Sequence, residues 1–333
     1  KLTRNMLEFL LEEDFVKEID RRPNPGFEAS QALTLSLTDL PEIVPPPENN
    51  CGVLVIDSGV QRGHPLISPA LGDADVFPDP EHQIVTGGPD DGDELTGGHG
   101  TGVSGVAVYG SINECIQEKS FQPHTWLFSA RVTNENNEYD PDSLLENQLG
   151  DAIQYFINAY PNCKVINISL GDSKLTFREG QKQFALAARI DELAYEYQHK
   201  NLVFVISAGN FNYDAVSNEL IRQDYPGYLL HGDARIIEPA TAAIALTVGS
   251  LSFGTGSHQY SEDAARNAIS KVKGYPSTFT RTGFGVDGMI KPELVDFGGD
   301  LVLNRQNLIS NDPGVAVLTL AKNFSGSLFR AYC

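Results

Sequence analysis

The chain has 333 residues, of which 41% are hydrophobic and 20% are charged, as expected for a globular protein with one large domain or two ordinary ones. Its 24 basic and 44 acidic side chains give a net charge of −20, which argues against binding to nucleic acid or to an anionic membrane surface. No apolar run approaches the roughly 18 residues of a membrane-spanning helix.

Residues 1–45 are expected to form an N-terminal extension, and residues 46–333 the main domain. Apolar side chains recur at helical spacing over residues 2–20 and predict an amphipathic helix. The segment RRPNPG (21–26) ends it, and PEIVPPPENN (41–50) is a proline-rich connector.

Four cysteines, Cys51, Cys115, Cys163 and Cys333, show neither a Cys-x-x-Cys motif nor metal-ligand spacing. Cys51 and Cys163 flank apolar runs, where a free thiol behaves as a small hydrophobe, so buried thiols are favoured over disulfides. Unpaired thiols weakly indicate a reducing compartment such as the cytoplasm. The first residue is Lys1 rather than Met, so the localisation and a removed signal or pro-segment stay open.

The main domain alternates short apolar runs with longer segments of helical period. The runs are GVLVID (52–57), HTWLFSARV (124–132), KVINISLG (164–171), LVFVISAGN (202–210) and AIALTVGS (243–250). Their continuous apolarity is typical of strands buried on both faces. Strand–helix alternation predicts an α/β fold, a doubly wound and mostly parallel sheet with helices on both faces, with function at the carboxyl ends of its strands.

Two helices between these runs have recognisable signals. Asp140-Pro141 predicts the start of one helix, and a capping box from Thr176 to Glu179 predicts the start of the other. Their apolar stripes are Leu145, Leu149, Ile153 and Phe156 in the first helix, and Leu186, Ile190, Leu193, Ala194 and Tyr197 in the second.

Three polar side chains stand at expected functional positions. Asp57 ends the strand GVLVID, His99 opens a helix of small residues after two glycines, and Asn210 follows the strand LVFVIS. A carboxylate can orient an imidazole, and an amide can donate to an oxyanion. Each residue taken alone also fits an ordinary turn or loop start.

Taken together and in this order, these segments resemble the subtilisin-like serine proteases, the subtilase family (peptidase S8). The matching stretches are VIDSGV (55–60), GHP (63–65), GGHGTGVSGV (97–106), INISLG (166–171), ISAGN (206–210) and KPELVDFGG (291–299). The resemblance covers roughly residues 45–333 and implies the subtilisin-like fold.

The resemblance implies a serine endopeptidase that acts on polypeptide substrates. Asp57 would orient His99, His99 would act as general base, and Asn210 would donate to the oxyanion. The backbone of Ser169, Leu170 and Gly171 would bind an extended substrate, and the primary side-chain pocket would lie between these residues and Ser207, Ala208 and Gly209. No cofactor or metal ligand is predicted; structural calcium, frequent in the family, has no clear ligand run here.

Some segments depart from the family pattern. TNENNEYD (133–140) replaces an expected glycine-rich wall of the substrate channel, and Asp172 stands where the family often has Gly, which favours basic substrate side chains nearby. The acidic segments DADVFPDPEHQ (73–83) and PDDGDE (89–94) are predicted to be solvated surface loops.

The family's serine nucleophile lies in a Gly-Thr-Ser-x-Ala block, which this sequence does not contain. Ser257, Ser325 and Ser327 stand at positions that the family does not use for catalysis. AKNFSGSLFRAYC (321–333) resembles the segment that precedes the block, so we expect a further C-terminal segment with the serine, and an inactive chain without it. The alternatives are a non-catalytic peptide-binding pseudoprotease and a metal-dependent hydrolase, the latter disfavoured because no His-Glu-x-x-His motif occurs.

Overall fold

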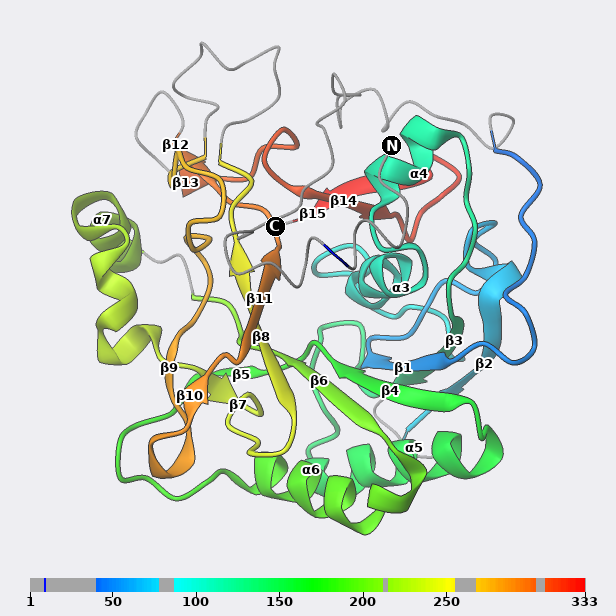
Figure 1. Ribbon diagram of the computed structural model, residues 1–333, viewed down its shortest axis with the longest axis horizontal. Helices are drawn as coiled ribbons and strands as arrows, with labels where there is room; N and C mark the ends of the chain where they lie inside the picture. The colour runs from blue at the N-terminus through cyan, green and yellow to red at the C-terminus, as the bar shows by residue number, and fades with distance from the viewer. Residues whose placement is uncertain are drawn as a thin grey trace.

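The computed structural model describes Phe9 and residues 40–77, 87–211, 215–254, 268–303 and 309–332 (Figure 1). The predicted helix over residues 2–20 lies outside these residues apart from Phe9. The described helices are α3 (His99–Tyr109), α4 (Ile112–Glu118), α5 (Leu145–Ala159), α6 (Ala185–Glu196) and α7 (Ala215–Asp224). The longer strands are β1 (Gly52–Asp57), β2 (Leu71–Val76), β3 (Trp126–Arg131), β4 (Cys163–Ile168), β5 (Asp172–Thr176), β6 (Val203–Ser207), β8 (Leu246–Leu251), β11 (Leu294–Phe297), β14 (Val317–Leu320) and β15 (Phe329–Tyr332).

Seven parallel strands form the main sheet, in the order β11-β8-β6-β4-β1-β3-β2. All five predicted strands are present in it, as β1, β3, β4, β6 and β8. Two-stranded pairs accompany it, among them β5 with β7 (Ile237–Glu238) and β14 with β15. The short strands β9 (Gly283–Phe284), β10 (Ile290–Lys291), β12 (Val302–Leu303) and β13 (Ile309–Ser310) form the other pairs.

The sheet is covered on both faces, as the α/β prediction requires. Successive side chains of a strand point to opposite faces. In β1, Val53 and Val55 pack in the core beneath α3, whereas Leu54 and Ile56 pack in the core with α5 and α6. Figure 1 shows α5 and α6 on one side of the sheet and α3 and α4 on the other. The doubly wound α/β prediction is therefore confirmed.

Helix α5 begins later than its sequence signal. Asp140-Pro141 was predicted to start it, but α5 begins at Leu145. The Asp140 carboxylate accepts the Asp142 N–H at 2.9 Å and forms a local turn in place of the first helical turn. The predicted stripe is correct, since Leu149, Ile153 and Phe156 are buried and Leu145 packs against the same core.

The capping box predicted at Thr176–Glu179 is wrong. Thr176 ends β5 and pairs with Ile237 of β7, and α6 begins nine positions later, at Ala185. The N-terminus of α6 is instead satisfied by a distant carboxylate, because Glu238 Oε1 accepts the Ala187 N–H at 2.8 Å. The predicted stripe does face the core: Leu186, Ile190 and Leu193 are buried, and Ala194 and Tyr197 pack against them.

Glu238 makes stability depend on pH. Its side chain is buried, its Oε2 atom has no hydrogen-bond partner among the described residues, and burial raises its pKa to about 7 from 4.5. Between these two pH values the unfolded state loses a proton that the folded state keeps, so stability falls as the pH rises, by about 3 kcal/mol.

We expect Glu238→Gln to abolish this decrease in the free energy of unfolding with rising pH, because a glutamine amide does not titrate. Unfolding free energies measured from pH 4.5 to pH 7 check this, with Glu196→Gln on the exposed surface of α6 as control. An unchanged slope in Glu238→Gln would contradict the assignment.

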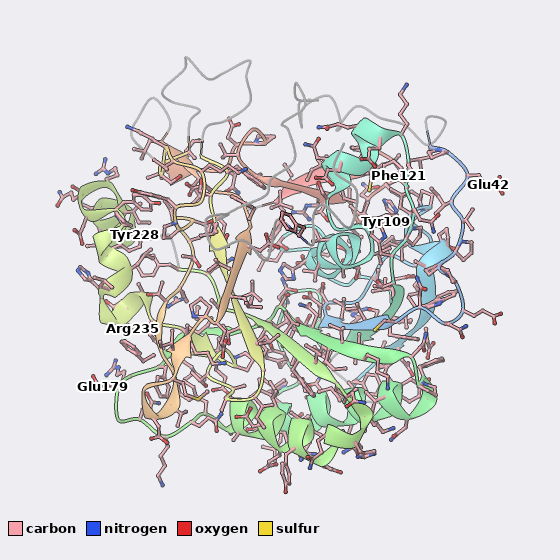
Figure 2. All side chains as sticks on the ribbon, viewed as in Figure 1. Glu42, Tyr109, Phe121, Glu179, Tyr228 and Arg235 are labelled. Atoms are coloured by element: carbon pink, nitrogen blue, oxygen red, sulfur yellow. The ribbon has the colours of Figure 1, made fainter. Side chains whose placement is uncertain are left out.

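Aromatic packing fixes the C-terminal end of α3. The rings of Tyr109 and Phe121, both labelled in Figure 2, lie 5.8 Å apart edge to face, and Phe121 stacks on Phe329 of β15 at 5.9 Å. The Tyr109 hydroxyl donates to the Leu66 carbonyl at 2.7 Å. These contacts anchor the helix that begins with His99.

The three described cysteines are free thiols, and only one is fully buried. Cys163 is buried, Cys115 is half-buried, and Cys51 is exposed, which contradicts the prediction of burial at this position. Cys51 directly precedes the first residue of β1, Gly52. Among the described residues no helix combines the length and apolarity needed to cross a membrane.

Candidate active site

Asp57 lies at the carboxyl end of β1 with its side chain directed to the α3 face of the sheet. Val53, Val55 and Asp57 alternate along the strand, so the carboxylate shares the face of the two valines. Asp57 is fully buried, and its Oδ1 accepts the Ser58 N–H at 2.8 Å. The strand thus holds a carboxylate at the base of helix α3.

His99 is the first residue of α3, and its ring faces Asp57. The imidazole Nδ1 lies 2.8 Å from Asp57 Oδ1 and 2.9 Å from Oδ2, and the His99 side chain is 20% exposed. Burial by itself lowers the pKa of His99, but the negative charges of Asp57, Asp93 and Asp91 outweigh it, and the pKa is raised above 6.5. A neutral His99 with Nδ1–H donated to Asp57 presents Nε2 as a proton acceptor.

Asp93 holds the N-terminus of α3. Its Oδ2 accepts the backbone N–H groups of Gly98 at 3.0 Å and His99 at 2.9 Å. Its Oδ1 accepts the Thr96 backbone N–H and the Asn137 side-chain amide, each at 2.9 Å. Although burial opposes ionisation, hydrogen bonds from the Thr96 hydroxyl and from the backbone N–H groups of Thr96, His99 and Gly98 lower the pKa of Asp93 to about 2. The orphan N–H groups at the start of the helix are thereby satisfied by a negative charge.

Asp91 ties the same helix to the loop after β1. Its Oδ1 accepts the Ser58 hydroxyl at 2.8 Å, and its Oδ2 accepts the Thr101 N–H at 2.7 Å and the Thr101 hydroxyl at 2.6 Å. Ser58 Oγ in turn accepts the Gly100 N–H at 3.0 Å. Burial raises the pKa of Asp91. Together these hydrogen bonds connect Ser58, directly after β1, to the first turn of α3.

The prediction that PDDGDE is a solvated surface loop is therefore wrong for Asp91 and Asp93, which are 4% and 0% exposed. The loop folds inward because the first N–H groups of α3 need acceptors. An acidic residue shortly before a helix start is a capping signal, and it could have identified Asp93 from the sequence.

Small residues on α3 let the β14–β15 pair approach it closely. A Cβ atom on Gly105 would lie 2.6 Å from Leu320 Cγ, and the Thr319 hydroxyl donates to the Gly102 carbonyl. The sequence-based prediction of a closely packed small-residue helix is correct. On the same pair, Tyr332 of β15 lies edge to face with the His99 ring, at 5.6 Å between centroids.

The two other predicted segments end strands beside β1. The register pairs Ile56 with Ile168 of β4, and Ile168 with Ile206 of β6. The next residues, Asp57, Ser169 and Ser207, therefore follow one another along the same edge of the sheet, about 5 Å apart from strand to strand. Parallel pairing brings the predicted residues to one edge.

Asn210 is exposed at the end of the β6 loop, and a buried arginine holds its backbone. Arg281 Nε donates to the Asn210 carbonyl at 2.8 Å, and its Nη1 donates to the carbonyls of Asp233 and Arg235 at 2.9 and 2.8 Å. Gly209 adopts a φ of 90°, which favours glycine. Arg281 was not predicted, because nothing local in TRTGFG indicates this contact.

Ser169, Leu170 and Gly171 connect β4 to β5, and Ser169 and Leu170 are half-buried, whereas Gly171 is exposed. The Ser169 hydroxyl donates to Asn167 Oδ1 at 3.0 Å. Asp172 begins β5 and is exposed; its carboxylate accepts the Lys174 N–H at 2.9 Å. Burial, together with the charges of Asp57 and Asp172, raises the pKa of Tyr139 in the TNENNEYD segment.

A family model described as the subtilase family, peptidase S8, matches residues 48–327. The chain belongs to the subtilase family. The predicted family is therefore confirmed. Among the described residues no group of three or more His, Cys, Asp or Glu side chains is arranged to hold a metal ion.

One curated relative matches part of this subtilase. An uncharacterized protein, y4bN, from Sinorhizobium fredii (strain NBRC 101917 / NGR234) is 38% identical over 193 residues, which are 56% of this chain and 43% of the relative. This subtilase thus matches less than half of that relative's length.

Two solved structures match large parts of this chain. The epidermin leader peptide processing serine protease from Staphylococcus aureus has a TM-score of 0.50 and 20% identity, covering 95% of this chain and 69% of its own. A cold-adapted subtilisin-like serine proteinase has a TM-score of 0.45 and 17% identity, covering 86% of this chain and 70% of its own.

Proposed function

We propose that this subtilase is the catalytic domain of a serine endopeptidase in which His99 is the general base and Asp57 its orienting carboxylate. The observation that carries the proposal is the contact of His99 Nδ1 with both oxygens of the buried Asp57, at 2.8 and 2.9 Å. A buried carboxylate in this position selects the tautomer with Nε2 free to accept a proton, and stabilises the imidazolium that forms.

The reaction is hydrolysis of a peptide bond in two steps. His99 Nε2 takes the proton of a serine hydroxyl as its oxygen bonds to the carbonyl carbon, and returns that proton to the leaving amine. A water molecule then releases the acyl group by the same route in reverse. Because the 333 residues contain no Gly-Thr-Ser-x-Ala block, we propose that the nucleophilic serine is not among them and that these residues by themselves are inactive.

Asn210 is proposed as the oxyanion donor, and Ser169, Leu170 and Gly171 as the backbone against which an extended substrate pairs. Their support is the register that aligns the ends of β1, β4 and β6 along one edge. An amide side chain at this edge can donate to the charge that develops on the carbonyl oxygen. The half-buried loop at 169–171 offers main-chain groups for strand addition.

A fluorophosphonate probe tests the proposed activity, because it reacts only with a serine activated by its neighbours. The native protein, which here means the natural full-length protein and not the 333 residues alone, should be labelled and should hydrolyse peptides. Labelling should disappear in His99→Ala. A peptide-binding pseudoprotease would bind peptides without labelling. The same absence of labelling, with hydrolysis sensitive to chelators, would indicate a metal-dependent hydrolase instead.

We expect Asn210→Ala to lower kcat by about 10²–10³-fold with little change in KM, because the lost donor acts mainly in the transition state. This magnitude was measured in subtilisin, another member of the family. Steady-state kinetics of the native protein check it, with Asn158→Ala at the end of α5 as control, where the side chain only accepts from Lys200. An equal loss in both variants would contradict the role.

A further inference from the structure

The side chain of Ile237 contacts both glycines at the edge of the proposed substrate site. A Cβ atom on Gly209 would lie 2.5 Å from both Cγ1 and Cδ1 of Ile237, and one on Gly171 would lie 3.0 Å from Cδ1 and 3.4 Å from Cγ1. Gly171 follows β4 and Gly209 follows β6, which are adjacent strands. One isoleucine therefore occupies the space between the two strand ends.

Ile237 is held firmly in this position. It is 3% exposed and belongs to β7, which pairs with β5, and its carbonyl accepts the Ala240 N–H at 2.7 Å. On the other side of Gly209, a Cβ atom would lie 3.3 Å from Arg281 Cδ, and Arg281 also binds the Arg235 carbonyl just before β7. A β-branched side chain in such packing has few alternative rotamers.

We propose that Ile237 closes the bottom of the pocket that receives the substrate side chain on the acyl side of the cleaved bond. This inference rests on the proposed function, which places substrate along 169–171 and 207–210. Because the isoleucine fills the gap, the pocket accepts Gly, Ala or Ser and excludes Leu, Phe and charged side chains. Forcing even a few extra methylenes into packed space costs about 1–3 kcal/mol.

Peptides that differ only at this substrate residue test the inference on the native protein. Internally quenched peptides with Gly, Ala, Ser, Leu or Phe are compared by kcat/KM. We expect the best small residue to exceed Leu and Phe by about 100-fold. Ile237→Ala should raise kcat/KM for the Leu and Phe peptides by about 10–100-fold, since it empties the space between Gly171 and Gly209.

Ile190→Ala serves as the matched control, because Ile190 is fully buried in α6 and is not among the nearest atoms to either Gly171 or Gly209. It should leave the order of preference unchanged. If Ile237→Ala does not fold, the profile of the unmutated protein still decides, because equal or faster cleavage after Leu or Phe overturns the inference.

The two proposals fail in different ways. A protein that the fluorophosphonate probe labels, but that cleaves after large side chains, keeps the proposed function and refutes the role of Ile237. A protein that is not labelled and cleaves none of the peptides refutes the proposed function and this inference with it.

Discussion

Asp57→Asn should lower kcat/KM for peptide hydrolysis by about 10⁴-fold, the loss known for this substitution in a serine protease of another fold. Asparagine keeps the size of the side chain but can donate its amide to Nδ1, which selects the tautomer with the proton on Nε2. His99 then cannot accept the proton of the serine. The native fold should be retained, because Asn can still accept the Ser58 N–H now bound by Oδ1.

The pH dependence of the residual activity provides a second readout. Activity requires neutral His99, so it falls as the pH drops through the His99 pKa. In the native protein that pKa is raised, and Asp57 is the largest cause of the rise, against burial, which lowers it. In Asp57→Asn the acid limb of the kcat/KM profile should move to lower pH.

The exposed Asp296 of β11 supplies the control for this experiment. Asp296→Asn removes one carboxylate without touching His99, so neither the rate nor the acid limb should change. If Asp57→Asn behaved like Asp296→Asn, the pairing of Asp57 with His99 would have no catalytic role.

Asp93→Ala should lower the free energy of unfolding by about 3 kcal/mol, because the N–H groups of Thr96, Gly98 and His99 lose their common acceptor. The same change loosens the first turn of α3, which carries His99. A displacement of about 1 Å is enough to lower the rate by about 10²-fold. Denaturant unfolding and peptide kinetics of the native protein measure the two effects.

The contribution of Asp93 also has a predictable pH window. Its pKa in the folded state is about 2, below its ordinary value of 3.8. Its stabilisation, about 2 kcal/mol, is thus complete above pH 4 and is lost as the pH falls towards 2. In Asp93→Ala this part of the acid destabilisation should be absent.

Asp75→Ala on β2 is the appropriate comparison, since its carboxylate accepts a single backbone N–H, from Val76 at 2.8 Å. We expect a stability loss well under half of that in Asp93→Ala, and no loss of activity. Equal effects in the two variants would show that Asp93 is an ordinary turn residue.

Local patterns were sufficient for five of the seven strands of the main sheet and for the three motif residues, but the prediction of a solvated loop over residues 73–83 is wrong for residues 73–76, which belong to β2. A strand buried on both faces is apolar throughout, and parallel strands must end at a common edge, so Asp57 and Asn210 could be placed at that edge from the sequence. Helix starts were less predictable. Asp140 caps a turn rather than α5, and Thr176 joins a strand, because the same side-chain chemistry suits turns, strands and helix starts alike.

The sequence by itself determined the α/β class, the order of the buried strands and the motif segments, because these depend on neighbouring residues and on strand period. Only the tertiary structure decided which distant side chains complete them. Glu238 caps α6, Arg281 holds the Asn210 loop, and Ile237 fills the gap between Gly171 and Gly209. A buried polar group needs a hydrogen-bond partner, and a buried gap must be filled by a side chain. The residues that do this are brought together by the fold from distant parts of the chain, so no local sequence pattern indicates them.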